Sequence, residues 1–434
     1  MKKILLVVTV LLVFACNIVF FSAAPVANAA DAGVFFDDEF KYDSDWEKGQ
    51  FLEYFVNNFS NRKGGTAGET AAAKYIAQIF EAYDNEYPGE FKPHNESLSV
   101  SGINRYLQNF SFSYNGNSYN SNNVIITKKA KVSVSNPKTV IIGAHYDNVY
   151  SLPRGKTESD YKFQGAYDNG TGIAVLIDLL DRLSKTDALD YNITFIAFGA
   201  EEYYMGGSSH YVDTMNYAPE DILLMINLDV VGAGDYLYLF CDDVKTQHQD
   251  FLFEIAKKRG ISLKAAPFDK IVTAGQMLDS MYYHIGLLSD NLPFLLKGIN
   301  CAFFFTYNWE HGLSESSDNV SIIHTENDNF STLKEKHENY QEYMNNVSDI
   351  VYYSLAADGF ESIMVESFKH KFDYSIFSNK VFLLCIGLGA LLLVCAFVYF
   401  QYQKFKKEKI TEIPIPSHSS EKIAVFGEDF EDRR

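Results

Sequence analysis

Four continuous apolar runs constrain the fold of this chain more than any other feature of its sequence. A strand that alternates apolar and polar residues has one face in water, whereas a strand buried on both faces is apolar throughout. These runs show no alternation, so each predicts a strand in the middle of a sheet. They are residues 139–144 (TVIIGA), 193–198 (ITFIAF), 222–228 (ILLMINL) and 300–305 (NCAFFF).

Segments with helical periodicity lie before and between these runs. Strands that alternate with helices indicate an α/β fold with a mostly parallel central sheet flanked by helices on both faces. Residues 105–127 alternate instead, and Asn115-Gly116 in their middle predicts a β-hairpin turn. The predicted helices are residues 43–62, 69–83, 172–183, 247–258 and a long final helix at 333–356.

Two apolar segments at the ends of the chain predict export and a membrane anchor. Residues 1–29 start with two lysines, continue with an apolar stretch and end in an A-x-A pattern, which is typical of a cleaved signal peptide. A buried first helix or an uncleaved anchor is the alternative. Residues 381–400 form a run of uncharged residues long enough to span a bilayer, and lysines follow it directly. Its alternative is a buried core helix.

These segments predict a single-pass protein of the cell membrane, with its folded domain extracytoplasmic. The lysines after residue 400 place the tail in the cytoplasm, because basic flanks stay on that side. The predicted parts are a signal peptide (1–29), a linker (30–44), a folded domain (45–358), a juxtamembrane segment (359–380), a transmembrane helix (381–400) and a cytoplasmic tail (401–434).

Composition narrows the classes of function. Hydrophobic residues make up 47% of the chain and charged residues 21%, so the chain is globular. Its net charge of −19 makes a nucleic-acid partner improbable, because phosphates need facing cations. The central part has two cysteines, Cys241 and Cys301, and either one disulfide or two buried thiols is compatible with the sequence.

Metal-ligand residue types recur where the predicted strands end. Carboxylates and imidazoles at the carboxyl ends of neighbouring strands gather at one edge of the sheet. Two histidines, two aspartates and one glutamate suit two zinc-like ions that share a carboxylate, and the second glutamate of an adjacent pair is left for proton transfer. The candidate residues are His145 and Asp147, Asp168, Glu201 and Glu202, Asp229, and His324.

The spacing of these residues resembles metallopeptidase family twenty-eight, the co-catalytic di-zinc aminopeptidases, over roughly residues 45–356. The motifs that carry the resemblance occur in the family's order. They are His-x-Asp at 145–147, Gly-Ala-x-Asp-Asn-x-x-Gly at 165–172, Glu-Glu at 201–202, Asn-x-Asp at 227–229, Ser-Asp-x-x-Pro-Phe at 289–294 and His-Thr-x-x-Asp at 324–328.

The resemblance implies a role for each residue. His145 and Glu202 are expected to hold one zinc, Asp229 and His324 the other, and Asp168 to bridge both. Glu201 is expected to be the general base, and Asp147 the carboxylate that orients His145. The family also implies a cis peptide bond between Asp168 and Asn169.

The implied activity is that of an aminopeptidase with two Zn²⁺ per chain, which hydrolyses the N-terminal peptide bond of peptides with a free N-terminus. A hydroxide bridging the two metals would attack the carbonyl. The alternatives are a glutaminyl cyclase of the same fold, a carboxypeptidase or acylase of the related two-metal family, and an inactive peptidase-like receptor. Side-chain preference, native metal and oligomeric state stay open. The aromatic residues at 303–309 are either core residues or a pocket wall.

Overall fold

The structure, a computed structural model, describes residues 41–96, 102–150, 161–241, 246–266, 289–307 and 322–369. All of them lie in the unit that spans Ala23–Ser375. The predicted signal peptide, transmembrane helix and tail fall outside the described residues. Among the helices that are described, none has both the length and the apolar character needed to cross a membrane.

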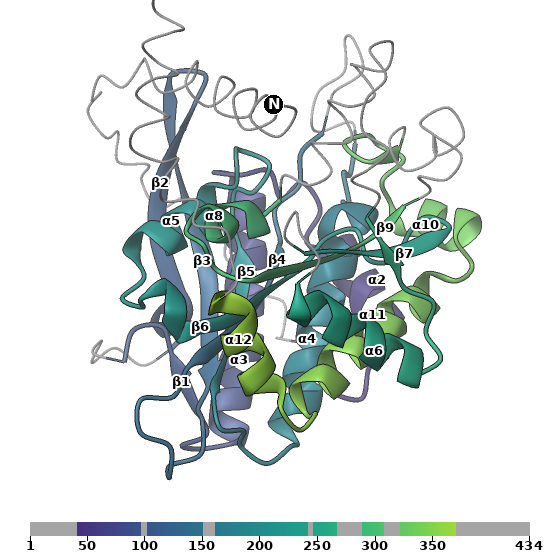
Figure 1. The fold of residues 1–434 in the computed structure, drawn as a ribbon. Helices are drawn as coiled ribbons and strands as arrows, with labels where there is room; N and C mark the ends of the chain where they lie inside the picture. Colours follow the sequence, from purple (N-terminus) through teal and green to yellow (C-terminus); the bar gives the residue numbers. More distant parts are fainter. Residues whose placement is uncertain are drawn as a thin grey trace, which may run out of the picture. The chain divides into compact units, whose positions relative to one another are not determined.

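A nine-stranded sheet runs through the described part of the chain (Figure 1). Along it the strands follow the order β1-β3-β5-β4-β6-β9-β7-β8, and β2 pairs with β3. The strands are β1 (Phe91–Pro93), β2 (Leu107–Tyr114), β3 (Asn117–Lys128), β4 (Thr139–His145), β5 (Asn192–Phe198), β6 (Ile222–Leu228), β7 (Tyr236–Phe240), β8 (Lys264–Ala265) and β9 (Cys301–Tyr307).

The four apolar runs form the parallel centre of this sheet, β5-β4-β6-β9, as predicted. The flanking strands correct the prediction of a mostly parallel sheet, because β3 is antiparallel to β5 and β7 is antiparallel to β9. The reason is the length of the connections. Residues 129–138 and 229–235 contain no helix, so the chain turns back at the same end of the sheet. The sheet is therefore mixed.

The β2–β3 hairpin turns at Asn115 and Gly116, as predicted. Both residues have positive φ, 49° and 77°, which the two-residue turns that join twisted strands require. The pairing of β2 with β3 then runs from Tyr114 opposite Asn117 to Leu107 opposite Val124.

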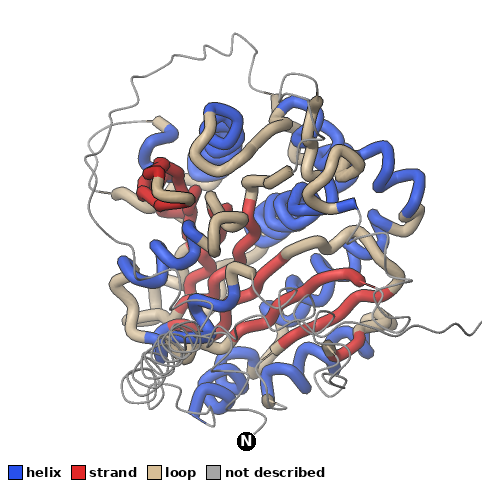
Figure 2. Tube along the Cα trace, turned by 90° about the horizontal axis from the view of Figure 1, so that it is seen from above, coloured by secondary structure: helices blue, strands red, loops and turns tan. Residues whose placement is uncertain are grey.

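Helices cover both faces of the sheet (Figure 2). Alternate residues of β4 separate the two layers: Val140 and Ile142 pack in the larger cluster, and Ile141 packs in the smaller one with residues of α5 and α8. The helices are α2 (Lys48–Asn58), α3 (Ala67–Glu86), α4 (Thr171–Ser184), α5 (Gly206–Thr214), α6 (Gln247–Lys258), α8 (Asn291–Leu296), α10 (Phe330–Lys336), α11 (Tyr340–Leu355) and α12 (Phe360–Lys369), with shorter helical turns at Ile103–Tyr106, Ala166–Gly170 and Pro219–Asp221.

The prediction of one long final helix at 333–356 is wrong, because this segment forms two helices, α10 and α11. His337 ends α10 with φ −129° and ψ 75°. Its Nδ1 accepts the N–H of Gly234 at 3.2 Å, and its ring lies edge-on to Tyr167 at 5.5 Å. These contacts with distant parts of the chain override the helical periodicity of the local sequence.

Burial decides between the alternatives left open for the aromatic residues of β9 and for the two cysteines. Phe303, Phe304 and Phe305 are all buried in β9, so these three aromatic residues belong to the core. Cys241 and Cys301 are both buried thiols.

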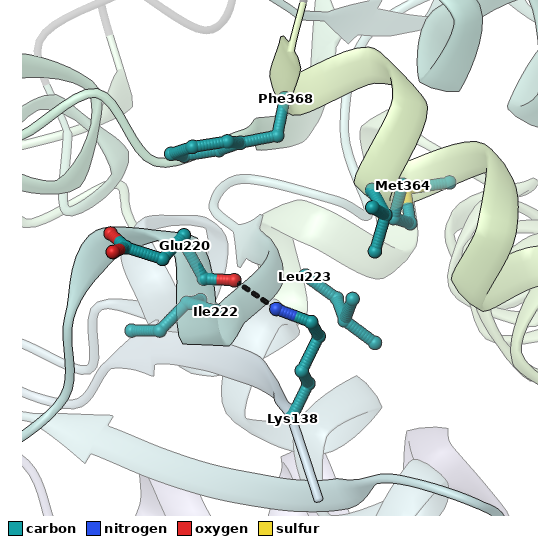
Figure 3. Close-up of a pocket in the computed structure, with 7 residues that line it drawn as sticks. Lys138, Glu220, Ile222, Leu223, Met364 and Phe368 are labelled. Atoms are coloured by element: carbon teal, nitrogen blue, oxygen red, sulfur yellow. Dashed lines mark hydrogen bonds between the residues drawn. The ribbon is translucent and has the colours of Figure 1, made fainter.

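Helix α12 packs on the domain, although residues 359–380 were predicted to connect it to the membrane. Phe360 and Met364 are buried in the larger core cluster. Met364 and Phe368 also line a cavity of about 160 Å³ beside Lys138, whose ammonium group donates a hydrogen bond to the carbonyl of Glu220 (Figure 3). This cavity lies where β4 and β6 begin, at the opposite edge of the sheet from the predicted metal ligands.

Met364 provides a test of whether α12 is part of the folded domain. We expect Met364→Ala to lower the free energy of unfolding by about 2–5 kcal/mol, because it leaves a cavity in a fully buried site. The exposed Ser362→Ala on the same helix should change it by less than about 0.5 kcal/mol. Denaturant unfolding measures both, and equal stability of the two variants would contradict the packing described here.

Candidate metal centre

The predicted ligands meet at the carboxyl edge of the sheet. His145 is the last residue of β4, and Asp229 follows the last residue of β6. Glu201 and Glu202 lie in the turn after β5, and Asp168 lies in the turn before α4. Because β4, β5 and β6 are parallel neighbours, these turns are brought together at one end of the sheet.

Two groups of possible metal ligands form there, and both contain Asp168. In the first, His145 Nε2 lies 3.1 Å from Asp168 Oδ1 and 3.2 Å from Asp229 Oδ1. In the second, His324 Nε2 lies 3.1 Å from Asp168 Oδ2 and 3.2 Å from Glu202 Oε2. The two oxygens of Asp168 therefore face different groups, as a bridging carboxylate requires.

This geometry corrects the expected pairing of the ligands. His145 was expected to share a metal with Glu202, but it groups with Asp229, and Glu202 groups with His324. The order of the motifs could not settle this, because β4 has both β5 and β6 as parallel neighbours. His145 could reach the residues that follow either strand, so only the positions of the turns decide its partner.

The donor set fits zinc. Zn²⁺ prefers imidazole nitrogen and carboxylate oxygen in a tetrahedral arrangement, with bonds of about 2.0–2.2 Å. Tetrahedral ligands at that distance are about 3.3–3.6 Å apart, close to the 3.1–3.2 Å separations within each group. Among the described residues, Glu202 Oε1 is buried without a hydrogen-bond partner, which suits an atom whose partner is a cation.

The two groups differ in exposure. The side chain of His145 is 1% exposed, whereas that of His324 is 45% exposed. His324 is therefore the member of the two groups whose side chain is most open to solvent.

Asp147 takes the orienting position expected for it. Its Oδ1 lies 3.5 Å from His145 Nδ1, and its own backbone carbonyl is closer, at 3.2 Å. A proton held on Nδ1 by these acceptors leaves the Nε2 lone pair free for a metal. The carboxylate of Asp147 also accepts the backbone N–H groups of Glu201 at 2.9 Å and Glu202 at 3.3 Å.

Crowded carboxylates shift the protonation equilibria of the site. Burial, together with the nearby Asp290 and Glu202, raises the pKa of Glu201 well above its ordinary value, against the effect of His145. Burial and the adjacent Asp168 raise the pKa of Glu202 to about 7. Burial opposes ionisation of Asp168, but hydrogen bonds from both histidines hold its pKa below its usual range. A site with this excess of negative charge favours divalent cations.

Asp328 fixes the turn that carries the bridging carboxylate. The motif His-Thr-x-x-Asp contains this residue, but the sequence assigned it no role. Its Oδ1 accepts the N–H of Tyr167 at 2.7 Å, and its Oδ2 accepts the N–H of Asp168 at 3.3 Å. The peptide bond between Asp168 and Asn169, in the same turn, is cis, as expected.

Asn169 and Ser289 fix the turn that carries Asp229. Asn169 Oδ1 accepts the N–H of Val230 at 3.2 Å, which holds this β-branched residue at a positive φ of 51°. Ser289 donates to Asp229 Oδ2 at 2.8 Å, so Asp229 Oδ1 is left to face His145. Asp290, beside Ser289, is fully buried near the ligands.

Arg62 is a buried cation beneath the site, and no motif indicated it. Its guanidinium is 0% exposed and donates to the carbonyls of Tyr146 at 2.6 Å, Gln164 at 2.6 Å and Gly165 at 3.2 Å. Burial lowers its pKa to about 10, which leaves it charged at neutral pH. Arg62 therefore joins the segment after His145 to the turn before Asp168.

Asp328 gives a test of this support for the metal ligands. We expect Asp328→Ala to weaken zinc binding about 10- to 100-fold, because partners that orient ligands have effects of that size. Glu326→Ala is the matched control, since it removes a carboxyl group from an exposed position in the same loop. Competition with a chelator measures both affinities, and equal zinc affinity of the two variants would show that Asp328 does not support the site.

Comparison with known proteins identifies the family. The profile described as Peptidase family M28 matches residues 123–351, more than half of the chain. Aminopeptidase YwaD of Bacillus subtilis (strain 168) is 31% identical over 216 residues, 46% of this chain and 41% of that protein. The alkaline phosphatase isozyme conversion protein of Escherichia coli (strain K12) is 29% identical over 222 residues, 48% of this chain and 59% of that protein. The chain thus matches about half the length of these relatives.

A solved structure shows the same fold. BSAP, a zinc aminopeptidase from Bacillus subtilis, aligns with a TM-score of 0.50 at 18% identity, covering 73% of this chain and 96% of that chain. The family match includes every residue of the two ligand groups. The chain therefore belongs to peptidase family M28.

Proposed function

We propose that this protein is a zinc-dependent aminopeptidase that binds two Zn²⁺ per chain and removes N-terminal residues from peptides. The observation that carries the proposal is the pair of ligand groups that share Asp168. Membership of a peptidase family supports the hydrolytic reaction. A relative named as an aminopeptidase supports action at a free N-terminus.

The ligand groups assign residues to each metal. His145, Asp168 and Asp229 would hold one zinc, and Asp168, Glu202 and His324 the other. Zinc held by these residues would lower the pKa of a bound water molecule and polarise the scissile carbonyl.

Glu201 is the proposed general base. It takes a proton from the attacking water and gives it to the leaving amine, so the peptide bond is replaced by a carboxylate and a free amine. Its backbone N–H is fixed by Asp147, which holds the turn beside the ligands.

We also propose that the protein is exported and anchored in the cell membrane, with its peptidase domain outside and its tail in the cytoplasm. The support is in the sequence: the signal-like residues 1–29, the uncharged residues 381–400 and the lysines that follow them.

Fractionation of cells that produce the full chain should recover the protein with the membranes. Recovery in the soluble fraction would contradict the anchor.

Replacing each of the two adjacent glutamates separately by glutamine tests their different roles. Glu201→Gln should lower kcat about 10²- to 10⁴-fold, the range for loss of a general base, with zinc content unchanged. Glu202→Gln should lose zinc as well, because it removes a ligand. Elemental analysis and steady-state kinetics on both variants measure this. Loss of zinc in Glu201→Gln would contradict the assignment.

A panel of substrates tests the proposed activity itself. Aminoacyl amides with a free amine should be hydrolysed, N-blocked copies should not, and a chelator should abolish turnover that added zinc restores. Turnover of blocked substrates alone would indicate an endopeptidase or carboxypeptidase. Ammonia release from a glutaminyl peptide would indicate a cyclase. Two bound zinc ions without turnover of any substrate would favour the receptor alternative.

A further inference from the structure

The turn that carries Glu201 and Glu202 is held by side chains from three other parts of the chain. Its four consecutive backbone N–H groups all donate to side-chain oxygens. Gly199 donates to Asn123 Oδ1 at 3.2 Å, Ala200 to Glu69 Oε1 at 3.0 Å, Glu201 to Asp147 Oδ1 at 2.9 Å and Glu202 to Asp147 Oδ2 at 3.3 Å. Asn123 comes from β3 and Asp147 follows β4, whereas Glu69 lies in the first turn of α3.

Ala200 is the residue of this turn that most needs support. Its φ is 51°, a left-handed conformation that costs a residue with a Cβ about 1 kcal/mol or more. The preceding residue has no room to adjust. A Cβ on Gly199 would lie 2.4 Å from Ser121 Oγ and 2.5 Å from the carbonyl of Asn122. The turn is therefore pressed against β3.

Glu69 supports Ala200 from a buried position. Glu69 is 1% exposed. Its carboxylate accepts three hydrogen bonds, from Ser121 Oγ at 2.5 Å, from the N–H of Gly65 at 2.6 Å and from the N–H of Ala200 at 3.0 Å. Among the described residues no ion pair joins it to a basic side chain. These hydrogen bonds offset part of the cost of burying the carboxyl group, but burial and the nearby Asp147 still raise the pKa of Glu69 to about 8.

Capping of α3 accounts for only part of the Glu69 contacts: Thr66-x-x-Glu69 has the residue pattern of a capping box, and the Glu69 carboxylate accepts the N–H of Gly65 beside the N-cap. Thr66 is its N-cap residue and accepts the N–H of Glu69 through its hydroxyl at 3.4 Å. A glutamate in the first turn can interact with the helix terminus while it stays in water. Glu69 instead points inward and contacts a turn 131 residues away.

We propose that Glu69 is a positioning residue for the active site: it holds Ala200 in its left-handed conformation and thereby directs Glu201 toward the reacting water and Glu202 toward the metal. For Glu201 this inference rests on the proposed function. For Glu202 it concerns metal binding alone, so it can be tested without any catalytic assay.

The test compares Glu69→Leu with Thr66→Ala. Leucine fills similar space but accepts no hydrogen bond, so the turn loses its hold on Ala200. Thr66→Ala removes the hydroxyl that accepts the backbone N–H of Glu69 and donates to the carbonyl of Lys63, but it leaves the three hydrogen bonds of the Glu69 side chain in place, and typical cap losses lower stability by about 1 kcal/mol. Thermal unfolding of both variants shows how much stability each loses.

Two readouts separate positioning from simple stabilisation. We expect Glu69→Leu to lower kcat about 10- to 100-fold with KM within about threefold, and to weaken zinc affinity about 10-fold. Thr66→Ala should change neither value by more than about twofold. Glu69→Gln keeps a carbonyl oxygen for Ala200 but places an NH2 group against the N–H of Gly65, so it should recover part of the activity that Glu69→Leu loses.

Each outcome of these measurements either supports or overturns the role proposed for Glu69. If Glu69→Leu matches Thr66→Ala in kcat and zinc affinity, Glu69 is only a structural residue of α3 and the inference is overturned. If Glu69→Leu does not fold, Glu69→Asp replaces it. Aspartate keeps the charge but is too short to hold Gly65 and Ala200 together, so the inference requires kcat and zinc affinity below those of Glu69→Gln. An inactive wild type refutes the proposed activity, while the zinc affinities still test Glu69.

Discussion

The structure depends on burying several carboxylates close together at one edge of a sheet. Like charges at such distances repel, and burial penalises each of them further. The fold meets this constraint in two ways. Asp168, Asp229 and Glu202 face imidazoles and one another, as metal ligands do. Asp147 and Asp328 are satisfied by backbone N–H groups instead.

The second group of carboxylates determines where the first group points. Asp147 follows β4 and fixes the turn after β5, and Asp328 fixes the turn that carries Asp168. Asn169 in turn fixes the residue after Asp229. Each ligand turn is thus held by a side chain from a different segment. Ligands held in this way lose little conformational freedom when they bind a metal, which reduces the cost of binding.

The sequence predicted well what depends on local pattern. Apolar runs predicted the parallel centre, Asn115-Gly116 predicted the hairpin, and residue types after the strands predicted the side chains that form the two groups of possible metal ligands. It failed where contacts between distant segments decide. His337 breaks the last predicted helix because Gly234 and Tyr167 hold it. The connections after β3 and β6 are too short to carry a crossover helix, so the sheet is mixed.

The sequence also did not predict the pairing of the ligands or the residues that support them. The strand of His145, β4, has two parallel neighbours, so the ligand that pairs with His145 depends on how the turns are held. No metal-site motif contains Arg62 or Glu69, and the backbone groups through which they hold the site lie 84 to 131 residues away in the chain. Such contacts leave no pattern of spacing. The export signal and membrane anchor stay predictions, because they lie outside the described residues.

The most direct test of this account is the anomalous scattering of crystals of the zinc-loaded protein, measured on both sides of the zinc absorption edge. The account requires two peaks that share Asp168, one beside His145 and Asp229 and the other beside Glu202 and His324. A single peak, or a metal shared by His145 and Glu202, would contradict the geometry on which the proposed function rests.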